Sequence, residues 1–215
     1  MTTLLVVLAA AFAVGNWIAV ARGKPGTRLE YVCKPAVMVA LLAAAVALDP
    51  VDDAARVWFV VALLLSLAGD VFLMLPDERA EWLFVAGLGA FLLAHVAYIG
   101  GFAARGIDWS GHWPALFIAP LIIGFLGVPI VRGARNRDAT LTIPVSVYIA
   151  VLIAMLLNAI ATGVALAALG AAVFAVSDAT LGWNRFVRTL RWGPLVVIVT
   201  YHVAQALLVV SLTTT

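Results

Sequence analysis

Residues 57–75 read VWFVVALLLSLAGDVFLML, a run of nineteen residues in which Asp70 is the only charged side chain. An α-helix crosses the hydrocarbon core of a bilayer in about 20 apolar residues, so this run is long enough to span a membrane. Similar runs fill most of the chain, whose 215 residues are 65% hydrophobic and 11% charged. Such a composition leaves too few polar groups for a water-soluble surface. The sequence therefore predicts an all-α, polytopic integral membrane protein.

Eight spans are predicted where apolar runs lie between breakers. The strands of a membrane β-barrel would alternate apolar and polar residues, and these runs do not. We expect one membrane domain over residues 1–215 without a separate soluble domain. The approximate helices are 3–21, 31–48, 57–75, 82–103, 114–131, 141–157, 163–181 and 195–212.

Basic residues are concentrated in alternate loops. The loops after the first, third, fifth and seventh spans hold ten of them, whereas the other loops hold only Arg56 and Arg105. By the positive-inside rule, this pattern predicts both termini outside the inner, cytoplasmic membrane of the cell. The ten residues are Arg22, Lys24, Arg28, Arg79, Arg132, Arg135, Arg137, Arg185, Arg188 and Arg191.

Residues 1–21 have a second interpretation, as a cleaved signal peptide ending at the small-x-small sequence Ala19-Val20-Ala21. A signal peptide has a basic n-region, which this segment lacks. Cleavage would also leave Arg22 and Arg28 on the side of the membrane that the charge pattern disfavours. We therefore expect residues 3–21 to be the first span.

Charge and cysteine content exclude some classes of partner. The net charge of +2 is too small to indicate nucleic-acid binding. Cys33 is the only cysteine, so neither an intramolecular disulfide nor a cysteine-based zinc site is possible. A small-residue pattern such as Gly163-x6-Gly170 is compatible with internal packing or with dimerisation, which leaves the oligomeric state open.

Three landmarks recur in the two halves of the chain. Pro35 and Pro144 open the second and sixth spans, Asp70 and Asp178 lie late in the third and seventh, and a His-Val-Ala tripeptide occurs in the fourth and eighth at His95 and His202. Their offsets are 109, 108 and 107 residues. Because four spans preserve orientation, this pattern indicates a parallel duplication of a four-helix unit, a plan known among transporters, although coincidence among Ala-rich helices is the alternative.

Ionisable residues inside the spans are the candidate functional groups. A charge in lipid costs at least about 2.5 kcal/mol, so such residues usually face the bundle interior. From a rise of about 1.5 Å per residue, both aspartates lie about 5–7 Å above the inner ends of their helices. A polar cluster is therefore predicted toward the inner leaflet. Its members are Asp70, Asp178, Lys34, Tyr148, Tyr201 and Gln205.

Each of these residues also has a purely structural interpretation. An aspartate can be the ion-pair partner of Lys34, and the tyrosines can simply pack with a satisfied hydroxyl. His95 lies about 20 Å from the inner end of its span, which places it too far from Asp70 to share a metal. We expect His95 and His202 to make interhelical hydrogen bonds, and Ser177 to bond to the backbone of its own helix.

Six strings in order resemble the YhhN/TMEM86 family of lysoplasmalogenases, over a stretch from the second span to the eighth. Any one string is weak, but together they are a specific match. The strings are Lys34-Pro35, Ser66-Leu-Ala-Gly-Asp70, Gly87-x3-Phe91-x2-Ala94-His95-x2-Tyr98, Pro144-x3-Tyr148, Gly170-x3-Phe174-x2-Ser177-Asp178 and Tyr201-x2-Ala204-Gln205.

The resemblance implies hydrolysis of the vinyl ether bond of a lysoplasmalogen, a lysophospholipid of the membrane, with Asp70 and Asp178 as the catalytic candidates. Cleavage of an enol ether passes through an oxocarbenium ion, which a protonated carboxyl and a second, ionised carboxylate suit, as in glycosidases. This chemistry requires neither a metal nor a cofactor. We expect the remaining polar residues to position substrate or water: Lys34, Tyr148, Tyr201, Gln205, His95 and Ser177.

Rival functions remain open from the sequence alone. The parallel repeat and the buried ionisable residues also suit a small proton-coupled transporter. A metal-dependent lipid hydrolase is possible if His202 approaches both aspartates. A third possibility is a lipid-binding or structural membrane protein without turnover.

Overall fold

The computed structural model describes residues 1–23, 27–75 and 80–215, apart from the side chains of residues 80 and 81. Within these residues every regular element is a helix, and eight helical segments are long and apolar enough to cross a membrane. The predicted all-α, eight-span class is therefore confirmed. Lys24 and Arg79, which contributed to the charge pattern, lie outside the described residues.

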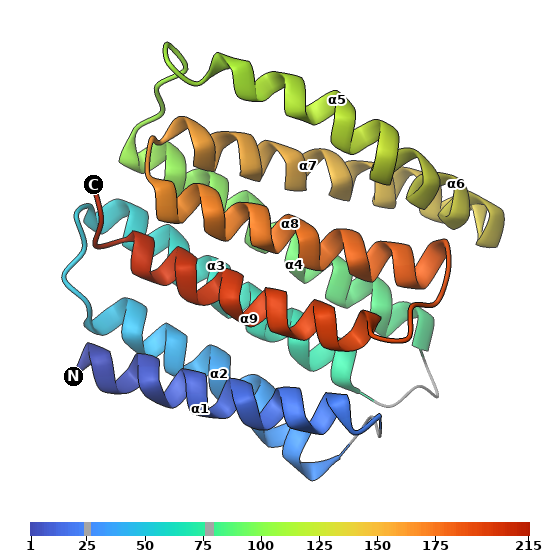
Figure 1. Ribbon diagram of the computed structural model, residues 1–215, viewed down its shortest axis with the longest axis horizontal. Helices are drawn as coiled ribbons and strands as arrows, with labels where there is room; N and C mark the ends of the chain where they lie inside the picture. The colour runs from blue at the N-terminus through green and yellow to red at the C-terminus, as the bar shows by residue number, and fades with distance from the viewer. Residues whose placement is uncertain (24–26, 76–79) are drawn as a thin grey trace.

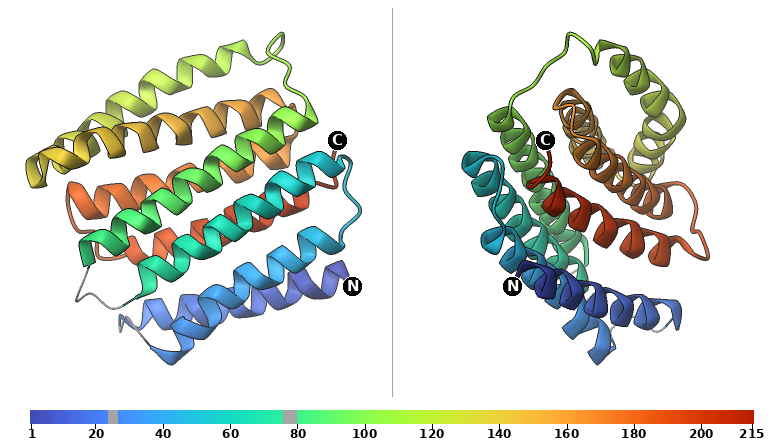
Figure 2. Two further views of the ribbon diagram at one scale, coloured as in Figure 1. Left: turned by 180° about the vertical axis from the view of Figure 1, so that it is seen from behind. Right: turned by 60° about the vertical axis from the view of Figure 1, so that its left-hand side comes forward.

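The helices run roughly along one direction and pack as a bundle, with α1 and α2 at one edge and α5 and α6 at the opposite edge (Figures 1 and 2). Both termini lie at one end of the bundle (Figure 1). We call the opposite end, which carries Arg22, Arg137, Arg188 and Arg191, the basic end. The helices are α1 (Thr2–Ala21), α2 (Arg28–Ala47), α3 (Asp53–Met74), α4 (Ala80–Arg105), α5 (Ile118–Ile122), α6 (Val128–Arg137), α7 (Thr142–Ala161), α8 (Ala165–Phe186) and α9 (Gly193–Ser211).

The two arginines that depart from the charge pattern both bind the carboxyl ends of helices. Arg56 Nη1 donates to the carbonyl of Leu48, the C-cap residue of α2, at 3.4 Å. Arg105 Nη1 donates to the carbonyl of Ser211, the last residue of α9, at 2.7 Å. The last carbonyls of a helix have no intrahelical partner and attract cations. These arginines therefore have a structural use at the end of the bundle that carries the termini.

The fifth span is not the single helix predicted over 114–131. It extends to Arg137, and its hydrogen-bond pattern changes along its length because a proline has no backbone N–H to donate. Only 11% of its most apolar window is buried, against at least 22% in every other span, so it is the most loosely held segment. Its parts are the 3₁₀ turn η2 (Trp113–Phe117), α5, the π turn η3 (Ile123–Gly127) and α6, with prolines at Pro114, Pro120 and Pro129.

The seventh span also extends beyond its predicted end at residue 181. Helix α8 continues to Phe186, where α6 crosses it closely at Gly133. A Cβ at Gly133 would lie 2.0 Å from the Phe186 carbonyl oxygen, so only glycine fits there. Trp183 and Phe186 pack on a cluster around Ile130. This packing stabilises the extra turn of α8, although the turn holds the charged Arg185.

The two halves pack in corresponding ways. Gly69 lets α3 approach α4, since a Cβ there would lie 2.7 Å from the Phe91 ring, and Gly170 lets α8 approach α9 beside Leu208 in the same way. At the centre, the Tyr98 hydroxyl donates a hydrogen bond to Gln205 Oε1. These two residues are 107 positions apart, the same offset as His95 and His202. Gly69 and Gly170 are 101 positions apart and so are not at equivalent positions of the predicted repeat; the duplication stays a prediction.

Candidate active site

Asp70 is held by a cation and a phenol. Its side chain is 2% exposed, and Oδ1 lies 3.2 Å from Lys34 Nζ on α2. Its other oxygen, Oδ2, accepts a hydrogen bond of 2.8 Å from the Tyr201 hydroxyl on α9. A buried carboxylate is stable only when it is paired and hydrogen-bonded, and both conditions are met here. The ammonium of Lys34 favours the ionised form of Asp70.

Asp178 has different partners. The Tyr148 hydroxyl on α7 donates a 2.5 Å hydrogen bond to its Oδ2, and His95 Nε2 on α4 lies 3.4 Å from the same oxygen. The His95 ring is fixed edge-to-face between Tyr148 and Phe174, with centroid distances of 5.4 and 4.8 Å. The partners of Asp178 are therefore a phenol and an imidazole, whereas those of Asp70 are an ammonium and a phenol.

His95 lies beside Asp178, a contact that the argument from depth, which concerned Asp70, did not predict. His95 is fifteen residues from the first residue of α4, which is about 22 Å, yet its ring contacts Asp178. Helix α8 runs past its predicted end, so Asp178 lies eight residues, or about 12 Å, from the last residue of α8, and the remaining difference in depth means that the ends of α4 and α8 are staggered. His95 is thus an immediate neighbour of one aspartate.

Each aspartate is contacted from two helices, and the two helices occupy corresponding places in the chain for both aspartates. One partner comes from the preceding span of its own half, Lys34 for Asp70 and Tyr148 for Asp178. The other comes from the last span of the opposite half, Tyr201 for Asp70 and His95 for Asp178. Both carboxylates therefore depend on contact between the two halves.

Both aspartates line one cavity of about 700 Å³, which we call the polar cavity. Lys34, Tyr201 and Ser177 also line it. Toward the basic end, its walls include Glu30, Asn184, Arg185, Arg191 and Trp192. Three acidic and three basic side chains thus line a space that is large enough for a small organic molecule.

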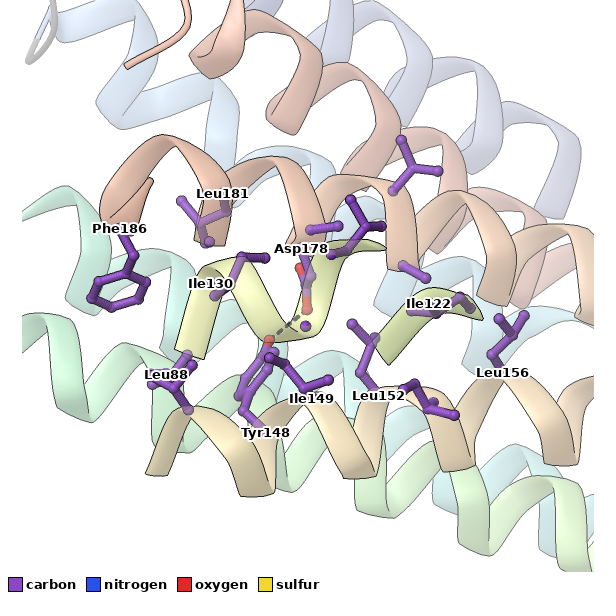
Figure 3. A pocket seen from close by; sticks show the side chains of 18 of the residues that line it. Leu88, Ile122, Ile130, Tyr148, Ile149, Leu152, Leu156, Asp178, Leu181 and Phe186 are labelled. Atoms are coloured by element: carbon purple, nitrogen blue, oxygen red, sulfur yellow. Dashed lines mark hydrogen bonds between the residues drawn. The ribbon is translucent and has the colours of Figure 1, made fainter. Parts of the chain in front are cut away.

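A second cavity of about 280 Å³, the apolar cavity, lies among α4, the fifth span, α7 and α8. Figure 3 shows Tyr148 and Asp178 joined by their hydrogen bond in the middle of this cavity, with aliphatic side chains on both sides. These two are the polar side chains of a lining that is otherwise apolar. Asp178, Phe84 and Leu181 line both cavities, so the carboxylate lies where the two meet.

Other predicted site residues have different surroundings. Gln205 lines neither cavity; it accepts from Tyr98 one turn beyond Tyr201. The expectation that Ser177 bonds to its own helix is wrong, because its hydroxyl donates to the Val197 carbonyl of α9 at 3.0 Å. That bond is favoured by the close packing of α8 on α9.

His202 makes the interhelical hydrogen bond that was expected, accepting at Nδ1 from Trp17 Nε1 of α1 at 3.1 Å. The metal alternative required His202 beside both aspartates. Among the residues that the structure describes, no three histidine, cysteine, aspartate or glutamate side chains gather in a way that would hold a metal ion.

Some lining residues were not foreseen. Arg191 and Asn184 follow α8 or end it, and in the sequence they are ordinary loop residues beside other basic ones. Phe84 and Leu181 have no signal at all, because an apolar residue in a membrane helix looks the same whether it faces a cavity or lipid. Only the folded structure shows that Arg185 and Arg191 lie near the same cavity.

The fold and site define a class: a polytopic helical membrane protein with two differently partnered, buried aspartates on a shared cavity. Residues 29–212 match the profile of the YhhN family, and the chain belongs to that family. A protein named lysoplasmalogenase from Mycobacterium bovis is 35% identical over 200 residues, which cover 84% of this chain and 75% of its own length. Human lysoplasmalogenase TMEM86B is 33% identical over 150 residues, covering 70% of this chain and 61% of its own. No solved structure matches the chain.

Proposed function

We propose that this protein is a membrane hydrolase that cleaves the vinyl ether bond of lysoplasmalogens, releasing a fatty aldehyde and a glycerophosphoethanolamine or glycerophosphocholine. Membership of the YhhN family and similarity to proteins named lysoplasmalogenase support this reaction. The observation that carries the proposal is that Asp70 and Asp178 line the same cavity although they come from separate halves of the chain.

The chemistry calls for a proton donor and an anion. A proton is transferred to the vinyl carbon remote from oxygen, which leaves an oxocarbenium ion. Water then adds to the carbon bonded to oxygen, and the hemiacetal breaks its bond to the glycerol oxygen, so aldehyde and alcohol form without any redox change. Paired carboxylates supply both functions in glycosidases, which pass through a similar cation.

The surroundings of the two aspartates suggest which carboxyl has which role. Asp70 is ion-paired with Lys34, which favours the carboxylate that stabilises the cation and accepts a proton from water. Asp178 has the Tyr148 hydroxyl and the His95 imidazole as neighbours, so it is the better candidate for the proton donor. In this scheme His95 and Tyr148 position the Asp178 carboxyl, and Tyr201 positions Asp70.

The cations at the polar cavity fit a phosphate. Arg185 and Arg191 lie on its wall toward the basic end, and Lys34, 13% exposed, lies on the wall next to Asp70. Guanidinium groups are well suited to bind phosphate oxygens. With the basic end in the cytoplasm, as the positive-inside rule favours, the headgroup would lie at the inner leaflet and both termini outside. No step of the scheme uses a metal or a cofactor.

Assaying the purified protein with a lysoplasmalogen tests the proposal, with aldehyde release as the measurement. Asp70→Asn and Asp178→Asn should each reduce the rate by at least about 100-fold, since each removes a group acting on the transition state. Asp49→Asn is the matched control, because Asp49 is an exposed aspartate in the connection between α2 and α3. Wild-type rates in both folded cavity variants would refute the mechanism.

A proton-coupled transporter is the second candidate function. The favouring observation is that ionisable side chains from both halves meet in the bundle interior, as in transporters built from repeats. Uptake into sealed vesicles that follows a pH gradient, without release of aldehyde, would support transport. Loss of hydrolysis after exhaustive chelation would instead favour the metal-dependent hydrolase.

A further inference from the structure

The two ends of the apolar cavity lie at different distances from the basic end of the bundle. Tyr148, Leu152 and Leu156 are spaced four residues apart on one face of α7, so this wall extends about 12 Å from Tyr148 to Leu156. Figure 3 shows Leu152, Ile122 and Leu156 to one side of Asp178, and Leu181, Ile130 and Phe186 to the other. Phe186 ends α8 at the basic end, so Leu156 marks the end of the cavity remote from the cations.

The two cavities together match an amphiphile. The polar cavity has cations and both carboxyl groups, the apolar cavity has an aliphatic wall, and Asp178 lies on both. In a lysolipid with a vinyl-ether-linked chain, the reacting bond lies between the polar glycerol part and the hydrocarbon chain. A molecule that fills both cavities therefore has that bond beside Asp178.

We propose that the apolar cavity binds the hydrocarbon chain of the substrate, running from Asp178 toward Leu156, and that Leu156 and Ile122 limit the length of chain accepted. The inference rests on the proposed function and adds a chain subsite to it. The direction follows from charge: Arg185 and Arg191 lie toward the basic end, where they bind the polar part, so the chain extends the opposite way.

The wall made by the fifth span suits this role. Ile122, Leu126 and Gly127 line the cavity from α5 and η3, the segment with the smallest buried fraction among the spans. A π turn inside a helix is commonly found at functional sites, and here it includes Leu126 and Gly127. A chain arriving from the bilayer meets, at this wall, the span whose side chains are least buried in the protein.

Variants at the remote end test the inference. Leu156→Ala lengthens the cavity, whereas Leu156→Phe and Ile122→Phe shorten it from opposite walls. Ile122 is half-buried on the loosely held span, so its variant should fold even if Leu156→Phe does not. Leu169→Ala and Leu169→Phe are matched controls, because Leu169 on α8 is 51% exposed and lines neither cavity.

The readout is kcat/KM for aldehyde release over lysoplasmalogens that share one headgroup and differ in chain length. Leu156→Ala should shift preference to longer chains by about fourfold per extra methylene buried, equivalent to about 0.8 kcal/mol. The phenylalanine variants should shift it to shorter chains. Chain-length profiles identical to those of the Leu169 controls, with wild-type hydrolysis intact, would overturn the inference alone.

A second measurement separates this inference from the proposed reaction. A lysophospholipid with a saturated ether chain has no vinyl bond to hydrolyse, so its binding reports the subsite without the chemistry. Chain-length preference in binding should shift in the Leu156 and Ile122 variants as it does in hydrolysis. If the wild type hydrolyses no lysoplasmalogen, the proposed reaction fails. The binding shift then supports the chain subsite, and its absence overturns it.

Discussion

The ion pair between Lys34 and Asp70 allows a quantitative test of the site. At 3.2 Å and an effective dielectric constant of about 20, two unit charges attract by about 5 kcal/mol. Lys34→Met removes the ammonium and leaves a carboxylate that is 2% exposed without its cation. Loss of one partner of a buried pair costs about 3–5 kcal/mol, so we expect a large fall in stability.

The assay is thermal unfolding of the purified protein in detergent, followed by tryptophan fluorescence. For domains of this length each kcal/mol lowers Tm by about 2–4 °C, so Lys34→Met should lower Tm by about 10 °C. Arg188→Met, at an exposed cation after α8, is the control and should change Tm little. Asp70→Asn added to Lys34→Met should restore most of the loss, because it removes the unpaired charge.

A double-mutant cycle tests directly whether Lys34 and Asp70 interact. A coupling of at least about 2 kcal/mol between Lys34→Met and Asp70→Asn supports the pair as drawn. Additive effects, within about 0.5 kcal/mol, would refute it. Activity provides a separate outcome: Lys34→Met should lower the rate of aldehyde release, because Asp70 loses the ammonium that pairs with it in the proposed mechanism.

Two further predictions concern a hydrogen bond and a close helix contact. Tyr148→Phe should lower kcat for aldehyde release by about 10–100-fold with little change in KM, because it removes the 2.5 Å bond that positions Asp178; an unchanged kcat would contradict this role. Gly69→Ala should destabilise the protein by about 1–3 kcal/mol in thermal unfolding, because the new Cβ would lie 2.7 Å from the Phe91 ring. Gly89→Ala, where a Cβ meets nothing within 4 Å, is its control and should be neutral or mildly stabilising.

The spans were predictable because membrane insertion depends on local quantities. An apolar run such as 57–75 has to cross the hydrocarbon core whatever its neighbours are, and α3 covers all of that run except Leu75. Helix ends were less predictable, since they respond to tertiary contacts. Helix α8 continues to Phe186 because Gly133 of α6 admits it, and nothing within residues 163–181 indicates that contact.

The sequence predicted the two aspartates of the candidate site but not which residues contact them. Buried ionisable residues are costly, which singles out Asp70 and Asp178 from sequence alone. Their partners depend on how helices are staggered, so His95 could not be assigned to Asp178 by depth. The apolar cavity was invisible, because Leu152 on its wall and Val147 facing outward are both ordinary apolar residues of α7.

The two halves of the chain give Asp70 and Asp178 different partners. Lys34 and Tyr148 are not at equivalent positions: the offset of 109 residues relates Lys34 to Ile143, and Tyr148 to Val39. One half places an ammonium before its proline and the other a phenol after it, so the two aspartates have partners of different chemistry. In the proposed mechanism, the different roles of Asp70 and Asp178 therefore depend on Lys34 and Tyr148, which have no counterpart in the other half.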